Sequence, residues 1–304
     1  MDLSVIIVSW NVQDYLAQCL ASLFANPPTC AFEVWVVDNS STDGSLQLVQ
    51  DQFPQVKIVK NLENVGFARA NNQAILQGTG RHILLLNPDT RVKPGALQKL
   101  VEFLEAHPTV GAVGSRLLNP DGSLQVSCFP FPTLSRELWR MFHLDALHPY
   151  ALYDMRRWKP FQPREVDVLQ GTSLALRREA LDQTGLLDES YFIYSEEVDL
   201  CYRLRKAGWR LYWVPQSEVI HYGGQSTQQV AARMFLYLYL TKLQYFRKHH
   251  GAQTARIYKL ILLVASLARL GLSSLAWMEP PSRREHHLKL AGNYVRLLKA
   301  LPGL

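Results

Sequence analysis

The first ninety residues alternate between short apolar runs and stretches in which apolar residues recur at helical spacing. The apolar runs cover residues 3–8, 32–37, 56–59 and 82–86. Helical spacing is found over residues 16–24, 46–53 and 66–77. Asn11 stands where a side chain can cap the first of these helices. Strands that alternate with helices predict a mostly parallel sheet with helices on both faces, an α/β fold.

The rhythm changes after about residue 110. Asn119-Pro120-Asp121-Gly122 predicts a turn between short apolar runs. Residues 129–163 are rich in aromatic residues, proline and arginine and fit no element. The periodicity then predicts one helix and two strands, over 196–207, 210–214 and 218–222. We therefore expect a mixed second half that packs on the first half as one unit.

Two acidic residues directly follow strands of the predicted sheet. Asp38 comes after the strand at 32–37, and Asp89 ends the string Asn87-Pro88-Asp89 after the strand at 82–86. The carboxyl ends of parallel strands meet at one edge of a sheet, where ligands of such sheets bind. We therefore expect Asp38 and Asp89 to lie close together in space.

Composition narrows the class of protein. With 304 residues, 48% of them hydrophobic, the chain can bury a sizeable core. Its four cysteines are too scattered for a metal knuckle or a disulfide scaffold, so we expect a reducing compartment. We expect no secretory signal, because no basic segment followed by an apolar one opens the chain. The absence of a Walker loop and of a G-x-G-x-x-G string argues against a usual triphosphatase or dinucleotide site.

Six strings, in this order, resemble those of family 2 glycosyltransferases, and within that family the rhamnosyltransferase-like branch. They are S-V-I-I-V-S-W-N (4–11), V-D-N-S-S-T-D-G-S (37–45), N-V-G-F-A-R-A-N-N (64–72), L-N-P-D-T (86–90), Y-S-E-E-V-D-L-C-Y-R-L-R-K-A-G (194–208) and H-Y-G-G-Q-S (221–226). Each string alone is weak. Their joint order and spacing over residues 3–250 is specific.

The resemblance implies a GT-A fold and an inverting, metal-dependent hexosyltransferase. Such an enzyme moves a single sugar, rhamnose or similar, from a dTDP- or UDP-sugar to a hydroxyl of a glycan or lipid-linked sugar in cell-surface polysaccharide or glycolipid assembly. The Q-x-x-R-W string of processive relatives is missing, which favours single addition. The implied domain covers residues 1–240, with a nucleotide-binding half over about 1–115 and an acceptor half over about 116–240.

The resemblance assigns donor recognition to Asp38 and to the start of the third helix. A carboxylate at Asp38 can accept the imide N–H of uracil or thymine, although Asp-Asn-Ser-Ser is also ordinary turn chemistry. Asn64 and Gly66 precede a helix whose free N–H groups suit phosphate, and Arg69 adds a positive charge. An ordinary loop-to-helix junction is the alternative.

Asp89 resembles the last Asp of a D-x-D metal motif. Asn87 replaces the first Asp of that motif and is a candidate for donor binding. Mg²⁺ or Mn²⁺ held by Asp89 and the donor phosphates would neutralise the diphosphate as it leaves. The substituted Asn87 leaves open how tightly the metal is held. His221 follows a strand where members of the family often carry a metal-binding histidine, and a structural histidine is the alternative.

Glu196, Glu197 and Asp199 form an acidic cluster at the start of a predicted helix. An inverting transferase needs a base that takes the proton of the acceptor hydroxyl. The resemblance gives this role to Glu197, a glutamate where aspartate is commoner. Glu196 and Asp199 are supporting residues or alternative bases. A favourable interaction with the helix dipole is the other explanation for the cluster.

Two further segments are candidates for contact with the sugar or the acceptor. Tyr194 belongs to an aromatic run, typical of a sugar-stacking site, that precedes the acidic cluster. Gly171 and Thr172 resemble a family loop that faces the donor sugar and the acceptor. Neither signal is specific by itself.

The tail, residues 241–304, is basic and apolar. Residues 242–304 carry eleven Lys and Arg against two acidic residues, a net charge of +9 in a chain of net charge +6. Residues 260–278 are nearly long enough to span a bilayer, but Arg269 lies in their middle. We expect an interfacial helix on anionic lipid, with Trp277 at the headgroups, and a buried helical hairpin is the alternative. The expected location is cytoplasmic, peripheral on the inner face of the cell membrane, with no nucleic-acid partner.

Two other classes of protein stay open. A nucleotidyltransferase on a similar sheet would want a basic or Gly-rich loop after the first strand, and Ser9-Trp10-Asn11 offers none. A nucleotide-sugar-binding protein with weakened catalysis is favoured by Asn87 and Glu197, the two departures from the family's motifs. The product released from the donor separates the three classes: nucleoside diphosphate, pyrophosphate or neither.

Overall fold

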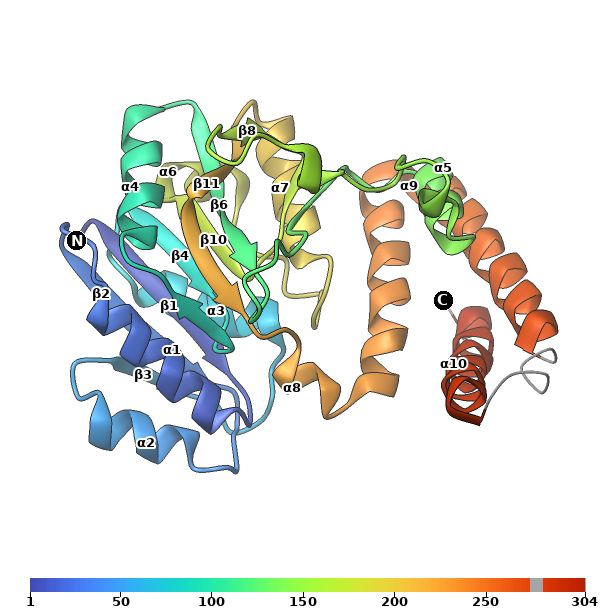
Figure 1. Cartoon of the computed structure of the whole chain (residues 1–304), viewed down its shortest axis with the longest axis horizontal. Helices are drawn as coiled ribbons and strands as arrows, with labels where there is room; N and C mark the ends of the chain where they lie inside the picture. The colour runs from blue at the N-terminus through green and yellow to red at the C-terminus, as the bar shows by residue number, and fades with distance from the viewer. Residues whose placement is uncertain (274–280, 304) are drawn as a thin grey trace. The chain divides into compact units, whose positions relative to one another are not determined.

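The computed structural model describes residues 1–273 and 281–303 of the chain, which divides into two compact units. The α/β unit comprises Met1–Phe131 and Tyr153–Gln229, and the helical unit comprises Pro132–Leu152 and Val230–Leu304. Figure 1 shows a sheet with flanking helices in the first and helices without a sheet in the second. The helical unit is therefore discontinuous in sequence, whereas the sequence analysis expects a single boundary near residue 240.

One nine-stranded sheet forms the centre of the α/β unit within the described residues. Its strands run in the order β3 (Lys57–Lys60), β2 (Phe32–Asp38), β1 (Leu3–Ser9), β4 (His82–Leu86), β10 (Ser173–Arg177), β6 (Val110–Leu118), β11 (Arg210–His221) and β5 (Thr90–Val92), with β8 (Arg164–Glu165) paired to β11. The first four strands are parallel, and β10 is antiparallel to both of its neighbours. The predicted α/β fold with a mostly parallel sheet is confirmed.

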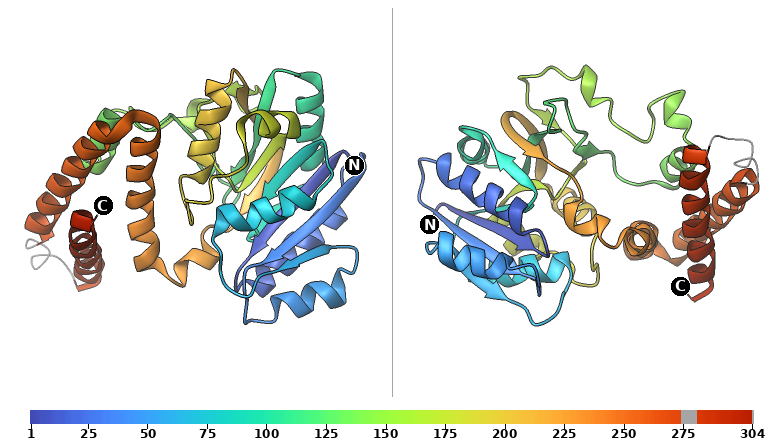
Figure 2. Two further views of the ribbon diagram at one scale, coloured as in Figure 1. Left: turned by 180° about the vertical axis from the view of Figure 1, so that it is seen from behind. Right: turned by 60° about the horizontal axis from the view of Figure 1, so that its bottom comes forward.

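Helices cover both faces of this sheet (Figure 2). One face is covered by α1 (Gln13–Ala25), α2 (Ser45–Gln52) and α4 (Ala96–Ala106), and the other by α3 (Phe67–Gln77), α6 (Arg178–Thr184) and α7 (Glu196–Lys206). Val5 and Ile7 of β1 pack in the first core, whereas Ile6 and Val8 pack in the second. Because β1 is buried on both sides, its sequence is a continuous apolar run instead of an alternating one.

Smaller elements complete the α/β unit. They are the paired strands β7 (Cys128–Phe129) and β9 (Val168–Leu169), a 3-10 turn at Met155–Arg157 and the short helix α8 (Gln225–Gln228). The strands expected at 210–214 and 218–222 are one strand, β11, whose pairing with β6 shifts register between Val214 and Glu218. Pro215 lies in this stretch and cannot donate to the ladder. The expectation of two strands is therefore wrong.

The residues around α1 also differ from expectation. The N-cap of α1 is Val12, which makes no side-chain capping bond. Asn11 instead has a φ of 52°, and its Oδ1 accepts a hydrogen bond from the Thr42 N–H at 2.7 Å. Asn11 therefore fastens the loop after β2 instead of capping a helix. The turn expected at 119–122 is present, with Gly122 at a φ of 83°.

The helical unit consists of α5 (Leu134–Met141), α9 (Ala231–Ser273) and α10 (Pro281–Ala300), with 3-10 turns at Leu144–Ala146 and Leu301–Gly303. Gly251 has φ 85° and ψ 170°, so α9 is two helical limbs joined at this residue. Both α5 and α10 pack against α9. The buried Glu137 on α5 accepts hydrogen bonds from Lys242 on α9 at 3.1 Å and from Arg140 at 2.9 Å. These ion pairs attach residues that the sequence analysis leaves unplaced.

The expected interfacial segment falls on the second limb of α9. Among the described residues, no helix is long and apolar enough to cross a membrane. Trp277 lies outside the described residues. Arg269, the charge that interrupts the apolar segment, donates a hydrogen bond to the Met141 carbonyl at 2.8 Å, and its guanidinium lies 5.5 Å from the centre of the Tyr294 ring. It therefore faces the interior of the helical unit.

Candidate active site

Asp38 lies at the carboxyl end of β2, beside the end of β1 (Figure 1). The residue is only 2% exposed, and its Oδ2 accepts a hydrogen bond from the Ser41 N–H at 3.3 Å. Its Oδ1 is buried and has no hydrogen-bond partner among the described residues. Because a buried polar atom without a partner costs free energy, this oxygen is well suited to accept an N–H from a ligand.

Asn39 organises the loops beside Asp38. Its Nδ2 donates to the Asn64 Oδ1 at 2.8 Å, and its Oδ1 accepts from the Asn61 Nδ2 and the Val65 N–H, each at 3.1 Å. Asn64 is thereby brought next to the loop that follows β2. The sequence analysis quotes Asn39 within a motif but gives it no role, because Asp-Asn-Ser-Ser reads as an ordinary turn.

Gly66 precedes α3 with a φ of 88°. A Cβ atom there would lie 2.6 Å from the carbonyl oxygen of Phe192, which also accepts a hydrogen bond from the Phe67 N–H at 2.7 Å. Position 66 must therefore be glycine so that the Phe192 backbone can approach. The Phe67 N–H is already hydrogen-bonded to that backbone. Arg69 is further along α3, more than half exposed, with its Nε 4.0 Å from the Glu189 carboxylate.

Asp89 and His221 meet through the pairing of β5 with β11, in which Thr90 stands opposite His221. The His221 Nε2 lies 3.4 Å from the Asp89 Oδ1, and both side chains are 7% exposed. Although this nitrogen is buried, it has no hydrogen-bond partner among the described residues. The two candidate metal ligands predicted from distant motifs are thus neighbours.

Gln125 orients the histidine. Its Oε1 lies 2.6 Å from the His221 Nδ1. Because an amide oxygen can only accept, Nδ1 carries a proton, and in the neutral imidazole the lone pair of Nε2 is then on the side of Asp89. The sequence analysis missed Gln125, since a glutamine after a turn carries no local signal.

The chemistry of this pair fits a divalent cation. A carboxylate oxygen and an imidazole nitrogen are ligands of Mn²⁺, and carboxylate also suits Mg²⁺. No group of three or more His, Cys, Asp or Glu side chains that could hold a metal is found in the described part of the chain. Asp89 and His221 would therefore leave most coordination positions to phosphate oxygens and water.

The loop at 170–172 connects the metal-ligand region to the acidic cluster. The Asn87 N–H donates to the Thr172 carbonyl at 2.9 Å, and the Asn87 Nδ2 lies 3.4 Å from the Thr172 Oγ1. A Cβ atom at Gly171 would lie 3.9 Å from the Glu197 Cβ and 3.7 Å from the Phe67 ring. Gly171 and Thr172 thus bring the string containing Asp89 near the start of α7.

Glu196 and Glu197 form the first turn of α7. Each has a buried Oε2 without a hydrogen-bond partner among the described residues. Burial raises the pKa of both carboxyls, and the negative charge of Glu197 raises the pKa of Glu196 further. Both carboxyls therefore hold their protons more tightly than exposed glutamates, and ionisation of one opposes ionisation of the other.

Asp199 is buried on the same helix, but its carboxylate is paired with an arginine. Its Oδ2 accepts from the Arg203 Nε at 2.7 Å, and Arg203 donates to the carbonyls of Thr184, Gly185 and Leu186 at 2.6 to 2.9 Å. The carboxylate thus positions Arg203, which holds the preceding loop. Its contacts indicate a structural role.

The backbone just before the acidic turn is strained. Tyr194 and Ser195 have φ values of 69° and 68°. Left-handed backbone is unfavourable for non-glycine residues and often marks functional sites. These two residues form a sharp turn between Phe192, which packs against Gly66, and the first turn of α7. Stacking of Tyr194 on a sugar stays a prediction.

The sheet and the residues at its edge define a glycosyltransferase of the GT-A fold. The fold is similar to that of a mannosyltransferase from Pyrobaculum calidifontis solved with GDP-Man and Mn²⁺, with a TM-score of 0.60 at 18% identity over 98% of this chain and 85% of that one. GalNAc-T7, solved with UDP, GalNAc and Mn²⁺, gives a TM-score of 0.56 at 18% identity over 73% of this chain and 44% of that one. At such identities the likeness concerns the fold alone.

The chain belongs to glycosyltransferase family 2, whose family model, Glycosyl transferase family 2, matches residues 4–184. Over 243 residues it is 32% identical to N-acetylglucosaminyl-diphospho-decaprenol L-rhamnosyltransferase of Mycobacterium tuberculosis, covering 74% of this chain and 77% of the relative. Over 239 residues it is 26% identical to rhamnosyltransferase WbbL of Escherichia coli, covering 76% and 87%. The expected family, its rhamnosyltransferase branch and the expected enzyme class are confirmed.

Proposed function

We propose that the protein transfers one sugar, rhamnose or similar, with inversion from a dTDP- or UDP-sugar to a hydroxyl of a lipid-linked glycan. The observation that carries the proposal is the buried, unpaired carboxylate oxygen of Glu197. Glu197 lies beside Gly171. The loop that contains Gly171 is also hydrogen-bonded to Asn87, through Thr172. A base and a metal-ligand pair joined by one loop are the two parts that such a transfer needs.

Glu197 accepts the proton of the acceptor hydroxyl as that oxygen attacks the anomeric carbon. The raised pKa of this carboxyl makes it a stronger base than an exposed glutamate. Asp199 is unsuited to the role because its charge is paired with Arg203. Burial and the charge of Glu197 raise the pKa of Glu196, which disfavours a second negative charge in the turn.

Asp89 and His221 hold the divalent ion, Mg²⁺ or Mn²⁺, together with the donor diphosphate. When bound, the ion neutralises the charge of the diphosphate leaving group. Gln125 holds the imidazole in the tautomer that can coordinate. The donor's base is recognised at the open Oδ1 of Asp38, which can accept the imide N–H of uracil or thymine. Asn64 and Arg69 are further donor-binding candidates.

The acceptor class is proposed from the relatives. The printed name of the mycobacterial relative gives its acceptor as an N-acetylglucosaminyl diphosphate on a polyisoprenoid, and we propose an acceptor of the same class. Because such a substrate resides in a membrane, we also propose peripheral association with the cytoplasmic face of the cell membrane. The basic helical unit supports this location.

A donor panel tests the proposal. Purified full-length protein is incubated with Mn²⁺ or Mg²⁺, a water-soluble N-acetylglucosaminyl diphosphate acceptor with a short alkyl chain, and dTDP-rhamnose or one of several UDP-sugars. We expect nucleoside diphosphate release that depends on the acceptor. We also expect a product whose new anomeric bond, read by NMR, is inverted relative to the donor.

The other product patterns contradict the proposal. Release of pyrophosphate in a parallel incubation with a nucleoside triphosphate and a sugar 1-phosphate identifies a nucleotidyltransferase. Donor binding by calorimetry without release of either product identifies a nucleotide-sugar-binding protein. Retention of the anomeric configuration removes the role given to Glu197.

A further inference from the structure

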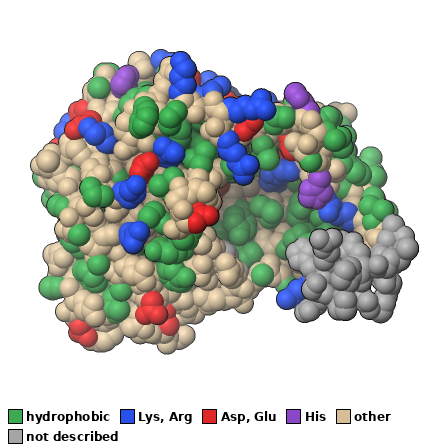
Figure 3. Space-filling model, in the orientation of Figure 1, with side chains coloured by type: hydrophobic (Ala, Val, Ile, Leu, Met, Phe, Trp, Pro, Cys, Tyr) green, Lys and Arg blue, Asp and Glu red, His purple; other side chains and the backbone are tan. Residues whose placement is uncertain are grey.

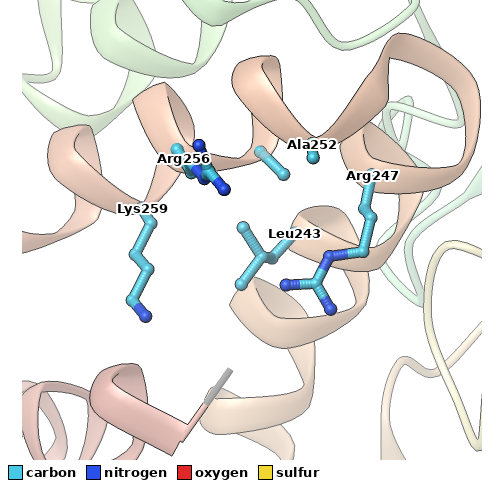
Figure 4. Close-up of a pocket in the computed structure, with 6 residues that line it drawn as sticks. Leu243, Arg247, Ala252, Arg256 and Lys259 are labelled. Atoms are coloured by element: carbon cyan, nitrogen blue, oxygen red, sulfur yellow. The ribbon is translucent and has the colours of Figure 1, made fainter.

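A hollow of about 350 Å³ lies in the helical unit where the two limbs of α9 meet at Gly251. It is lined by Leu243, Arg247, Ala252, Ala255, Arg256 and Lys259. Figure 4 shows Arg247 on the limb before Gly251, and Arg256 and Lys259 on the limb after it, around the same space. Three cationic side chains thus surround one hollow, and its lining has no acidic residue.

Two of the cations that line this hollow, both arginines, are not neutralised by a described acidic side chain. Arg247 and Arg256 have no ion-pair partner among the described residues. The acidic side chains described in the helical unit are Glu137 and Asp145. Glu137 is paired with Lys242 and Arg140, and Asp145 accepts from the backbone of residues 150 and 151. Among the described side chains, the lining of the hollow is therefore positively charged and suited to an anion.

The second limb of α9 exposes apolar residues on the side opposite its packed face. Tyr258, Leu262 and Ala265 are buried. Large apolar residues that are 39% to 57% exposed recur at positions three or four apart; they are Ile257, Leu260, Leu263, Val264 and Leu267. We call these five residues the outer face of α9. At 100° per residue they form one stripe on the side away from the buried residues.

The outer face adjoins the hollow. Arg256 and Lys259, which line the hollow, alternate with Ile257 and Leu260 along the same helical turn. Figure 3 shows hydrophobic side chains at the surface over the second limb of α9. Contiguous exposed apolar surface beside cations is typical of an interfacial helix. Arg269 does not interrupt the stripe, because it faces the Met141 carbonyl.

We propose that the helical unit docks on an anionic lipid surface, with one phosphate-bearing headgroup in the hollow and the outer face of α9 among the acyl chains. This inference deepens the membrane association proposed above, on which it rests. Cations around a concave site can bind one phosphate group through several charged donors. The apolar stripe beside them selects a lipid as the source of that phosphate over a soluble anion.

The test is flotation of the full-length protein with vesicles of phosphatidylcholine alone or phosphatidylcholine with phosphatidylglycerol. The triple variant Arg247→Gln, Arg256→Gln, Lys259→Gln should bind the anionic vesicles roughly a hundredfold more weakly, since each cation at a membrane surface contributes about a factor of five. The matched control is Arg156→Gln, Lys159→Gln, Lys206→Gln, three exposed cations of the α/β unit. It removes the same charge and should bind like the parent.

A second pair of variants tests the apolar stripe. Leu260→Gln with Leu267→Gln should weaken binding to anionic vesicles more than tenfold, because two apolar side chains no longer enter the lipid. Leu76→Gln with Phe161→Gln changes two apolar residues of the α/β unit that are even more exposed, at 75% and 77%, and should have no effect. Circular dichroism and melting temperature check that each variant is folded.

Several outcomes overturn the inference. Equal weakening by the two triple variants means that binding follows net charge and not the hollow. Tight binding of inorganic diphosphate without divalent metal that the triple variant loses, together with unchanged vesicle binding of the Leu260 and Leu267 variant, makes the hollow a soluble-anion site. A parent dimer that this variant dissociates, seen by light scattering, means that a second copy covers the stripe. Transfer to the short-chain soluble acceptor is measured alongside and should survive in the triple variant, which separates failure of docking from failure of the proposed function.

Discussion

Each end of β2 has a buried carboxylate, and the two differ in whether their oxygens are hydrogen-bonded. At the amino end, the Glu33 Oε1 accepts from the Ser4 hydroxyl and the Thr79 N–H, each at 2.7 Å, and its Oε2 lies 2.8 Å from the Lys57 Nζ. At the carboxyl end, one oxygen of Asp38 has no partner among the described residues. Burial by itself raises the pKa of Glu33, but these hydrogen bonds outweigh it and lower the pKa to about 2.

The same contrast separates the two edges of the sheet. At the amino edge, both carboxylate oxygens of Glu33 are paired with neighbours in the fold. At the carboxyl edge, buried atoms of Asp38, His221 and Glu197 have no partner in the described structure. The pairing of Asp199 with Arg203 shows that a carboxylate within one turn of Glu197 can be satisfied. Burial alone therefore does not identify a functional acid. A buried oxygen without a partner is a further criterion, which Asp38 and Glu197 meet and Glu33 does not.

The largest effect is expected from the metal-ligand pair. Asp89→Ala should lower transfer by more than about a thousandfold, because bound metal contributes several kcal/mol to stabilising the leaving group. The control is Asp2→Ala, which removes a carboxylate paired with Arg81 at the amino edge and should keep full activity. Initial rates are measured across Mg²⁺ and Mn²⁺ concentrations. Full turnover of the parent in excess chelator would exclude the metal role.

The next effect concerns the base. Glu197→Gln keeps the shape of the side chain but removes its basicity, so transfer should fall by about two to four orders of magnitude. Donor affinity, measured by calorimetry, should be unchanged, because Asp38 and Asp89 are intact. Rates are compared at saturating donor and acceptor.

Asp199→Asn is the matched control on the same helix. It breaks a buried pair and should lower the free energy of unfolding by about 3 kcal/mol. The activity of the protein that remains folded should stay within tenfold of the parent. A folded but inactive Asp199→Asn beside an active Glu197→Gln would move the base to Asp199.

The amino edge gives a third effect, on stability alone. Glu33→Ala leaves the Ser4 hydroxyl and the Thr79 N–H without their acceptor and should cost about 2 kcal/mol. Because the folded pKa of Glu33 lies below its ordinary value of 4.5, its contribution is complete above that value and is lost as the pH falls toward 2. The difference in melting temperature from the parent should therefore be constant near neutrality and shrink below about pH 4.5. A reduced kcat at neutral pH would contradict the division between the two edges.

Sequence patterns predicted the parts of the molecule that depend on local periodicity. The alternation of apolar runs and helical spacing gave the parallel strands β1 to β4 and the helices between them. The carboxyl-edge rule placed Asp38 and Asp89 at strand ends because strand direction follows from the connections. The sharp bends and bulges, such as Asn11 and Pro215, depended on contacts that periodicity does not record.

The long-range partners of the site were beyond the sequence. Gln125 is 96 positions from His221 in the sequence. Gly66 must be glycine because Phe192, much later in the chain, packs against it. Nothing in the sequence around Gln125 or Phe192 indicates these long-range contacts. The pairing of Asp199 with Arg203 is of a more local kind, because the two are four positions apart on one helix face.

The smallest effect is expected at Glu196, the neighbour of the proposed base. Burial and then the charge of Glu197 raise the pKa of Glu196, which favours its protonated form beside an ionised Glu197. Glu196→Gln imitates that protonated acid. Transfer should therefore change by no more than about threefold, and the acid limb of the kcat/KM profile, which reports Glu197 above its ordinary value of 4.5, should not move.

Stability gives an independent reading of the same substitution. A carboxyl whose folded pKa is raised binds its proton more tightly in the folded state, so its cost to stability grows as the pH rises above 4.5. Glu196→Gln removes that cost, and its melting temperature should exceed that of the parent by more at pH 8 than at pH 5. If instead the acid limb shifts by a full pH unit, or the rate falls more than tenfold, the proton of the acceptor is shared between both glutamates and the first turn of α7 acts as a coupled pair.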